Sequence, residues 1–376
     1  MKVLIIPDKF KGSLSGKEVT EQIVHGLHDF DDLIETHAIS GSDGGDGFLE
    51  SIAQTIKNAK WIDCQTTDPL GREIQASFLF DPQREFAYVE MARASGLELL
   101  TTEERNPLRT SSLGTGLLIR RAIDHGARSV FVGLGGSATN DGGAGIASAL
   151  GYRLLDADGS PLPPGGGHLT HLERIERSPI EPLLRQVRFF AINDVCNPLL
   201  GPEGAAQVYA PQKGADPEMV RQLEAGLDCL QRVVRRDLDV EVASVPGAGA
   251  AGGAGYGLKA FLNAEFLSGI EFVLSQSEIE ALLNGGQIDY IVTGEGRIDD
   301  QTAYGKLVRG VAKAGASYGV PVVAICGQLD LKQKSVEDLG LSNVLQIHQP
   351  GSSIEYTMEN AGALVRQAAA QILKPS

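Results

Sequence analysis

The chain has 376 residues, 46 of them glycine, and carries a net charge of −15 from 33 basic and 48 acidic side chains. The length favours two domains, and an acidic chain without a run of five basic residues argues against a nucleic-acid or anionic-membrane partner. The four cysteines show no CxxC or Cys/His spacing, which argues against structural zinc and a disulfide framework. The apolar run Val3–Pro7 is too short for the core of a signal peptide. We therefore expect a cytoplasmic protein.

Short apolar runs alternate with amphipathic segments along the chain, which is typical of an α/β fold. In chain order, the expected elements are strand 2–6, helix 15–28, strand 32–38, helix 48–56, helix 112–125, strand 129–132, helix 144–150, strand 187–192, helix 216–236, strand 290–293, strand 320–325, strand 344–347 and helix 361–372. Between residues 61 and 91 the pattern changes to three β-rich pieces separated by the turn signals DPLG and DPQR. This change predicts a small antiparallel β insertion.

The two ends of the chain share one order of features, which is a strand, then an acidic glycine loop, then a helix. We therefore predict that residues 1–100 and 286–376 form one discontinuous α/β domain of the flavodoxin or Rossmann type, with the β insertion at about 61–91 inside it. Residues 101–285 are expected to form a second α/β domain that carries the longest glycine loop. Both sheets should be mostly parallel.

The run from Gly133 to Gly145, GLGGSATNDGGAG, is the strongest indication of a ligand site. It lies between a strand and a helix, an arrangement that directs backbone N–H groups at an anion. The run also contains two hydroxyls, an amide and a carboxylate, a mixture that suits a phosphate with a divalent cation. It lacks the GxxxxGK[ST] pattern and matches the dinucleotide fingerprint only loosely.

Two acidic or basic clusters lie near the N-terminus. PDKFKGSLS places Lys9, Lys11 and Ser13 just past a strand end, where ligands of open α/β sheets bind, and its Ser15 with Glu18 has the pattern of a capping box. SDGGDG supplies a pair of carboxylates that suits Mg²⁺, although a turn with an aspartate as helix cap is the alternative.

Two further clusters lie in the second half of the chain. NDVCNP places Asp194 at a strand end, where a base that orients an attacking hydroxyl would lie, or alternatively a turn cap. TGEGRIDDQT, followed by Gly305 and Lys306, again combines acids and a lysine around a strand end, which fits metal and phosphate binding.

Taken together, the clusters resemble those of the type I glycerate kinases, the bacterial glycerate 2-kinase family. The matching stretches occur in order over nearly the whole chain and are PDKFKGSLS, SDGGDG, GLGGSATNDGGAG, NDVCNPL with APQKGA, GAGAAGGAGYG and TGEGRIDDQTAYGK. Two positions depart from the pattern, since a cysteine is expected at Asn193 and an aspartate at Cys196.

The resemblance implies that the γ-phosphoryl group of ATP is transferred to D-glycerate, with Mg²⁺, in a cleft between two α/β domains. The usual product in this family is 2-phosphoglycerate, and 3-phosphoglycerate is the alternative. Glycerate and ATP would be the small-molecule partners, with no nucleic acid and no membrane involved.

The resemblance also suggests roles for residues. We expect the nucleotide phosphates to bind Gly135, Gly136, Ser137, Thr139, Asn140, Gly142, Gly143 and Lys306. The candidate Mg²⁺ ligands are Asp43, Asp46, Glu295 and Asp299. Lys9 and Lys11 would balance the charge of the transferring phosphoryl group, and Asp194 would orient the substrate hydroxyl. Lys9, Ser13, Arg93 and Asp194 are the candidates for binding glycerate.

Two other classes of function compete with this interpretation. A dinucleotide-dependent oxidoreductase would need an acid about 20 residues after its glycine fingerprint, a place that Asp156 or Asp158 could take. A non-catalytic small-molecule binding protein would also use two domains, but it has little need of five loops that carry acids or lysines. The seven histidines lack HxxxH or HExxH spacing, which disfavours a zinc hydrolase.

Overall fold

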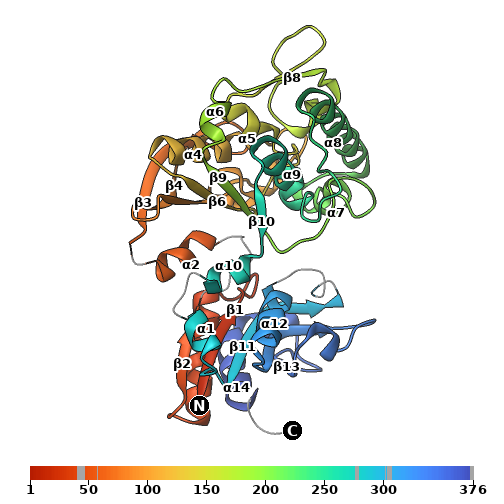
Figure 1. The fold of residues 1–376 in the computed structure, drawn as a ribbon. Helices are drawn as coiled ribbons and strands as arrows, with labels where there is room; N and C mark the ends of the chain where they lie inside the picture. The colour runs from red at the N-terminus through yellow and green to blue at the C-terminus, as the bar shows by residue number, and fades with distance from the viewer. Residues whose placement is uncertain (40–46, 57, 276–278, 301, 303–306, 373–376) are drawn as a thin grey trace. The chain divides into compact units, whose positions relative to one another are not determined.

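The computed structural model describes residues 1–39, 47–56, 58–275, 279–300, 302 and 307–372 (Figure 1). The chain divides into two compact units. Unit 1 comprises Met1–Asp43, Glu50–Thr55 and Ser268–Ser376, and unit 2 comprises Gly44–Leu49 and Ile56–Leu267. The prediction of an α/β protein with mostly parallel sheets is confirmed.

Unit 1 is built on a sheet of five parallel strands in the order β13-β12-β11-β1-β2. The strands are β1 (Lys2–Pro7), β2 (Glu35–Ala38), β11 (Tyr290–Asp299), β12 (Val322–Asp330) and β13 (Asn343–Gln346). Numbered within the unit, this order is 2-1-3-4-5, which is that of flavodoxin-like folds. The order reverses between β1 and β11, and ligands of such sheets bind beyond the carboxyl ends of those two strands.

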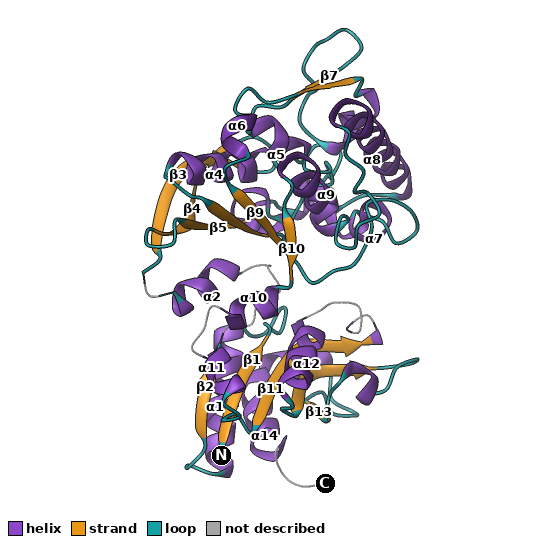
Figure 2. Ribbon diagram, viewed as in Figure 1, coloured by secondary structure: helices purple, strands orange, loops and turns teal. Residues whose placement is uncertain are grey.

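Helices cover both faces of this sheet (Figure 2). The helices of unit 1 are α1 (Gly16–Phe30), α10 (Gly269–Ser275), α11 (Ile279–Asn284), α12 (Leu307–Tyr318), α13 (Ile354–Glu359) and α14 (Ala361–Ile372). The residues of α2 (Phe48–Thr55) are divided between the two units. The predicted capping box starts α1, since the Glu18 N–H donates to Ser15 Oγ and the Ser15 N–H donates to the Glu18 carboxylate. Val19, Ile23 and Leu27 are buried together with α14 against one face of the sheet, which explains the apolar spacing of α1.

Unit 2 contains a six-stranded sheet in the order β10-β9-β6-β5-β4-β3. The strands are β3 (Lys60–Thr67), β4 (Glu73–Asp81), β5 (Phe86–Glu90), β6 (Ser129–Gly133), β9 (Arg188–Ile192) and β10 (Glu265–Leu267). Strands β5, β6, β9 and β10 are parallel, and β3 and β4 form an antiparallel hairpin at one edge.

The structure corrects the predicted place of the β insertion. Residues 61–91 do not belong to the unit that contains both chain ends, because β5 pairs in parallel with β6 in the sheet of unit 2. The aromatic rings of Tyr88, Phe131 and Phe190 stack across β5, β6 and β9 with centroid distances of 5.3 and 4.6 Å. The three residues are register partners, so their rings form one row across the three strands. Unit 1 also resumes at Ser268 rather than at the predicted residue 286.

The remaining elements of unit 2 surround its sheet. They are α3 (Ala92–Ser95), α4 (Leu113–Asp124), α5 (Ala144–Ala149), α6 (Glu181–Leu184), α7 (Ala205–Tyr209), α8 (Pro217–Leu238), α9 (Ala250–Leu262) and the separate hairpin of β7 (Arg153–Leu155) and β8 (Arg174–Glu176). The longest of these, α8, starts at an Asp216 cap and buries Leu223, Leu227 and Val234 at helical spacing. Among the described residues, no helix is long and apolar enough to cross a membrane.

Close packing of α1 against α14 gives a first prediction. A Cβ placed on Gly26 would lie 2.2 Å from the carbonyl oxygen of Arg366, so Gly26→Ala must push the two helices apart. We expect the free energy of unfolding to fall by about 1–3 kcal/mol. Urea denaturation measures this change.

The matched control is Gly16→Ala at the start of the same helix, where the nearest atom to the new Cβ is 3.9 Å away. It should leave stability unchanged or raise it by under about 1 kcal/mol. Equal stability of both variants would contradict the packing argument.

Candidate functional site

The loop after β6, residues 134–143, is held between the turns that follow β5 and β9. The Leu134 N–H donates to the Ile192 carbonyl at 3.1 Å, which fixes the loop to β9. The Ala138 N–H donates to the Ser95 carbonyl at 2.8 Å, which fixes it to the turn after β5. The carboxyl ends of three neighbouring parallel strands therefore set the position of this loop.

A second glycine-rich segment lies directly against the loop. Residues 251–253, at the start of α9, all have positive φ angles, and the Gly142 N–H donates to the Gly252 carbonyl at 3.1 Å. A Cβ on Gly252 would lie 2.0 Å from the Thr139 carbonyl oxygen. Only a residue without a side chain allows this approach, which explains why the sequence pairs two glycine motifs that are more than a hundred residues apart.

The carboxylate of Asp141 joins the loop to the first turns of α4 and α5. It accepts hydrogen bonds from the Ser112 N–H and hydroxyl at 2.8 and 2.9 Å, and from the Gly143 and Gly145 N–H groups at 3.1 and 3.2 Å. Asp141 is only 1% exposed. Four donors of this kind satisfy a buried carboxylate that would otherwise be costly to remove from water. Sequence analysis did not single out this residue.

Lys213 lies beneath the loop and was also missed as a site residue, although its motif APQKGA was noted. Its ammonium group donates to Ser137 Oγ at 2.9 Å and to the Thr139 carbonyl at 2.7 Å. The side chain is buried, with 2% exposure, in the short 3₁₀ turn Pro211–Lys213. Burial lowers the pKa of Lys213 to about 7, and the negative charge of Asp141 opposes this shift.

The part of the loop that solvent reaches is the turn at Gly135 and Gly136. In the part of the chain that the structure describes, the N–H groups of Gly135, Gly136 and Ser137 donate no hydrogen bond. The loop thus offers three adjacent backbone donors at its accessible side, which is the arrangement that binds an anion.

Thr139 and Asn140, predicted to contact the nucleotide, lie inside the protein with 0% exposure. Asn140 Nδ2 donates to the Ala205 carbonyl at 3.2 Å, whereas Asn140 Oδ1 and Thr139 Oγ1 have no partner among the described residues. Their side chains therefore lie under the loop rather than on its accessible side. Direct contact of these two side chains with a ligand stays a prediction.

Two other sequence-predicted residues lie at the same edge of this sheet. Asp194 follows β9 directly and is half-buried. Arg93 lies in α3 after β5, with its guanidinium carbon 4.8 Å from the centre of the Trp61 ring. The structure therefore brings Arg93, the glycine loop and Asp194 to the carboxyl ends of β5, β6 and β9.

The predicted residues of unit 1 gather at the point where its strand order reverses. Lys9, Lys11 and Ser13 follow β1, and Ser13 Oγ donates to the Phe10 carbonyl at 3.1 Å. A pocket of about 150 Å³ in this unit is lined by Lys11 and Ser13 together with Gly296 and His348. Lys11 and Ser13 thus share one cavity with the neighbouring strand β11.

Glu295 and Asp299 lie four positions apart on β11, each two positions from Arg297, so the three side chains fall on one side of the strand. Glu295 is buried and accepts a hydrogen bond from Thr302 Oγ1 at 2.8 Å. Arg297 lies between the two acids and approaches the Asp299 carboxylate at 3.6 Å.

The carboxylates of Glu295 and Asp299 fit Mg²⁺, because proteins usually bind this ion through one or two carboxylates, with water and substrate phosphates as the remaining ligands. Among the described residues, no group of three or more acids, histidines or cysteines could hold a metal by itself. The predicted residues Asp43, Asp46 and Lys306 lie outside the described residues.

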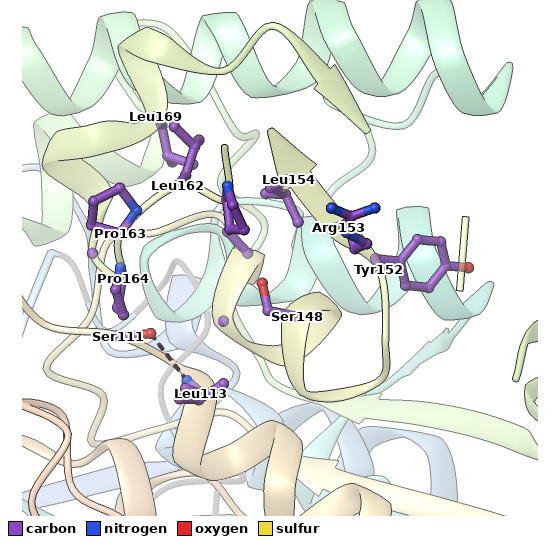
Figure 3. Close-up of a pocket in the computed structure, with 14 residues that line it drawn as sticks. Ser111, Leu113, Ser148, Tyr152, Arg153, Leu154, Leu162, Pro163, Pro164 and Leu169 are labelled. Atoms are coloured by element: carbon purple, nitrogen blue, oxygen red, sulfur yellow. Dashed lines mark hydrogen bonds between the residues drawn. The ribbon is translucent and has the colours of Figure 1, made fainter. Parts of the chain in front are cut away.

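A further pocket in unit 2, of about 190 Å³, lies beside the first turns of α4 and α5 (Figure 3). Leu113, Leu154 and Leu169 form part of its apolar wall, and Ser148 and Arg153 add polar groups. Ala144 and Gly145, at the end of the glycine run, line this pocket, but none of the described candidate ligand-binding residues does.

Comparison with known proteins places the chain among glycerate kinases. A model of the glycerate kinase family matches residues 3–375. A glycerate kinase of Halalkalibacterium halodurans is 42% identical over 98% of this chain and 97% of its own, and a glycerate 2-kinase of Escherichia coli is 41% identical over 93% and 88%. A crystal structure of a protein assigned as glycerate kinase 2 from Salmonella typhimurium matches with a TM-score of 0.79 and 39% identity, over 99% of this chain and 97% of that one.

The role of Asp141 gives a second prediction. In Asp141→Asn, the amide NH₂ group would face N–H donors of the loop, and the buried bonds would be lost. We expect the free energy of unfolding of unit 2 to fall by about 3 kcal/mol. Urea denaturation followed by tryptophan fluorescence measures it.

Asp228→Asn is the control for loss of an aspartate charge, because Asp228 forms only an exposed ion pair with Arg232 on α8 and a bond to Gln231. Its effect should stay under about 0.5 kcal/mol. If Asp141→Asn were as mild as this control, Asp141 would not hold the loop.

Proposed function

We propose, since the chain belongs to the glycerate kinase family, that it transfers the terminal phosphoryl group of ATP to a hydroxyl group of D-glycerate. The favoured product is 2-phospho-D-glycerate, and 3-phospho-D-glycerate is the alternative. The observation that carries this proposal is the row of N–H groups at Gly135–Ser137, which donate to none of the described residues. This row follows β6, and Asp194 follows β9, the strand that pairs with β6.

The glycine loop is the proposed site for the nucleotide phosphates. Catalysis of phosphoryl transfer depends mainly on aligning the reacting groups and on neutralising the charge of the phosphates. Fixed backbone donors meet both needs, because they already point at the position of the phosphate oxygens and need no rearrangement during the reaction. The buried bonds of Asp141 and Lys213 keep the loop in this conformation.

Asp194 is the proposed residue that orients the attacking hydroxyl of glycerate. It follows β9, the strand that pairs with β6, and the glycine loop follows β6. A carboxylate at this position can accept the hydroxyl proton as the oxygen attacks the phosphorus atom. Arg93 follows β5, the strand that pairs with the other side of β6, and it is the weaker candidate for binding the glycerate carboxylate.

Most of the other proposed groups belong to unit 1. Lys9 and Lys11 would balance the negative charge of the transferring group, and Ser13 would contribute to glycerate binding. Glu295 and Asp299, with Asp43 and Asp46, are the proposed ligands of Mg²⁺, which supplies charge neutralisation on the phosphates when bound. Lys306 is a further proposed phosphate contact.

The positions of Asp156 and Asp158, the acids that a dinucleotide-dependent oxidoreductase would need, do not support that alternative. Asp156 closes a turn by accepting from the N–H groups of Asp158 and Ser160 at 3.0 and 2.8 Å. Strand β7, which precedes this turn, pairs with β8 in a separate hairpin and not with the parallel sheet. A ribose-binding acid belongs at the end of a second strand of that sheet.

A coupled assay of ADP release with Mg-ATP and D-glycerate tests the proposed function. We expect ADP only when glycerate is present, and NMR of the product identifies the hydroxyl that carries the phosphate. Absence of glycerate-dependent ADP release by the folded protein would overturn the proposal.

Asp194→Asn provides a third prediction. Loss of the base should lower kcat by about 100-fold or more, while the Kd for Mg-ATP stays unchanged because the glycine loop is intact. Steady-state kinetics and calorimetry measure the two quantities.

Glu203→Gln removes an exposed acid from the segment that follows Asp194 and should keep full activity. A folded Asp194→Asn variant with unchanged kcat would remove Asp194 from the mechanism.

A further inference from the structure

Lys213 is a buried cation in unit 2 that the proposed reaction does not yet use. Among the described residues, no carboxylate forms an ion pair with its ammonium group. The nearest charge that acts on its pKa is that of Asp141, whose oxygens are engaged by Ser112 and by the N–H groups of the loop. A lysine in such a place normally loses its charge unless an anion compensates it.

The two hydrogen bonds of Lys213 affect which hydrogen-bond donors and acceptors of the loop are available to a ligand. The bond to the Thr139 carbonyl turns that oxygen towards the protein interior and away from an approaching anion. The bond to Ser137 Oγ uses the oxygen as acceptor, so the hydroxyl hydrogen of Ser137 is left to donate elsewhere. Both effects favour a row of donors on the accessible side of the loop.

Among the described residues, Asp141 is the only acid whose charge acts on Lys213. Its backbone N–H donates to the Ala210 carbonyl at 3.0 Å, and Gly214 next to it adopts a positive φ angle of 95° that ends the turn. The backbone of Lys213 is therefore held in the turn, and its ammonium group is held by Ser137 and Thr139 of the loop. It cannot follow a ligand outward, so it acts on a phosphate through the loop and through its charge.

We propose that Lys213 is a positioning residue of the nucleotide site, which holds the glycine loop through Ser137 and Thr139 and takes up one proton when the phosphates bind. The inference rests on the proposed function, because it requires that the loop binds the nucleotide. The proton comes from the solvent and converts the neutral amine to an ammonium group. No bond of the nucleotide is broken in this step.

The pH dependence of binding follows in sign from the lowered pKa. The pKa of Lys213 is about 7 without ligand, and a bound phosphate raises it. Above pH 7 most Lys213 side chains are neutral, and their protonation on binding reduces the net free energy of binding. The Kd for the nucleotide therefore rises with pH, by up to about tenfold per pH unit. Below pH 7 the lysine is already charged and adds no pH dependence. Asp141 is the charged group whose effect opposes the lowering of the Lys213 pKa.

Calorimetry of Mg-ADP binding in Hepes and in Tris at the same pH tests the proposal, because the heats of buffer ionisation differ. At about pH 8 we expect the wild-type protein to take up close to one proton per nucleotide, and at about pH 6 nearly none. In Lys213→Met, the uptake at pH 8 should disappear and the Kd should rise at least about tenfold. Lys213→Arg, which keeps its charge, should bind without proton uptake.

Lys259→Met is the matched control, since Lys259 is a part-buried lysine of α9 that donates to the Ala264 carbonyl away from the loop. It should keep both the affinity and the proton uptake of the wild type. Wild-type binding without proton uptake at pH 8 would overturn the proposal even if Lys213→Met failed to fold.

Gly136→Val separates this inference from the proposed function, because it places a side chain at the accessible turn, where φ is 69°. If Gly136→Val abolishes Mg-ADP binding while Lys213→Met leaves the affinity and proton uptake intact, the role of Lys213 is wrong and the loop remains the nucleotide site. If neither variant changes binding, the nucleotide does not bind at this loop, and both proposals fail there.

Discussion

The hydrogen bonds of the Asp141 carboxylate are the interaction on which the geometry of unit 2 depends. They join the start of α4, the start of α5 and the glycine loop, and so add polar bonds to the close packing of α4 against α5. A buried carboxylate is costly unless donors surround it, so these segments are held in the one arrangement that supplies them. Ser112 completes the set by donating from both its backbone and its hydroxyl group.

The Lys213 side chain supports the same loop through its bonds to Ser137 and Thr139. Together with Asp141 it forms a buried polar frame, while Gly252 and Gly257 allow the second glycine segment to pack within contact of the backbone. The interior of the loop is therefore rigid, and the accessible turn at Gly135 and Gly136 shows its N–H groups to solvent. Fixed donors of this kind are what phosphoryl transfer requires of a protein.

Much of this architecture could be predicted from the sequence because its signals are local. The Ser15–Glu18 capping box, the apolar spacing of α8 and the glycine run after β6 each involve residues that are neighbours in the chain. Local patterns do not identify the partner of a strand, which is why β3–β5 were assigned to the wrong unit. The stacked rings of Tyr88, Phe131 and Phe190 that decide this pairing come from three distant segments.

The same difference between local patterns and contacts of distant segments applies to the candidate site. The positions of Asp194 and of the glycine loop at strand ends could be predicted from the motifs. The role of Lys213 could not, because its partners Ser137 and Thr139 are 76 and 74 residues away in the chain. Nor could spacing show that the side chains of Thr139 and Asn140 point inward, since only packing decides which side of a loop is accessible.

The account as a whole depends on phosphate binding at the accessible turn of the loop. The most direct test is a crystal structure with Mg²⁺ and a non-hydrolysable ATP analogue. We expect phosphate oxygens of the analogue to accept hydrogen bonds from the N–H groups of Gly135, Gly136 and Ser137. An analogue whose phosphates lie away from these groups, with the turn in contact only with water, would contradict the account.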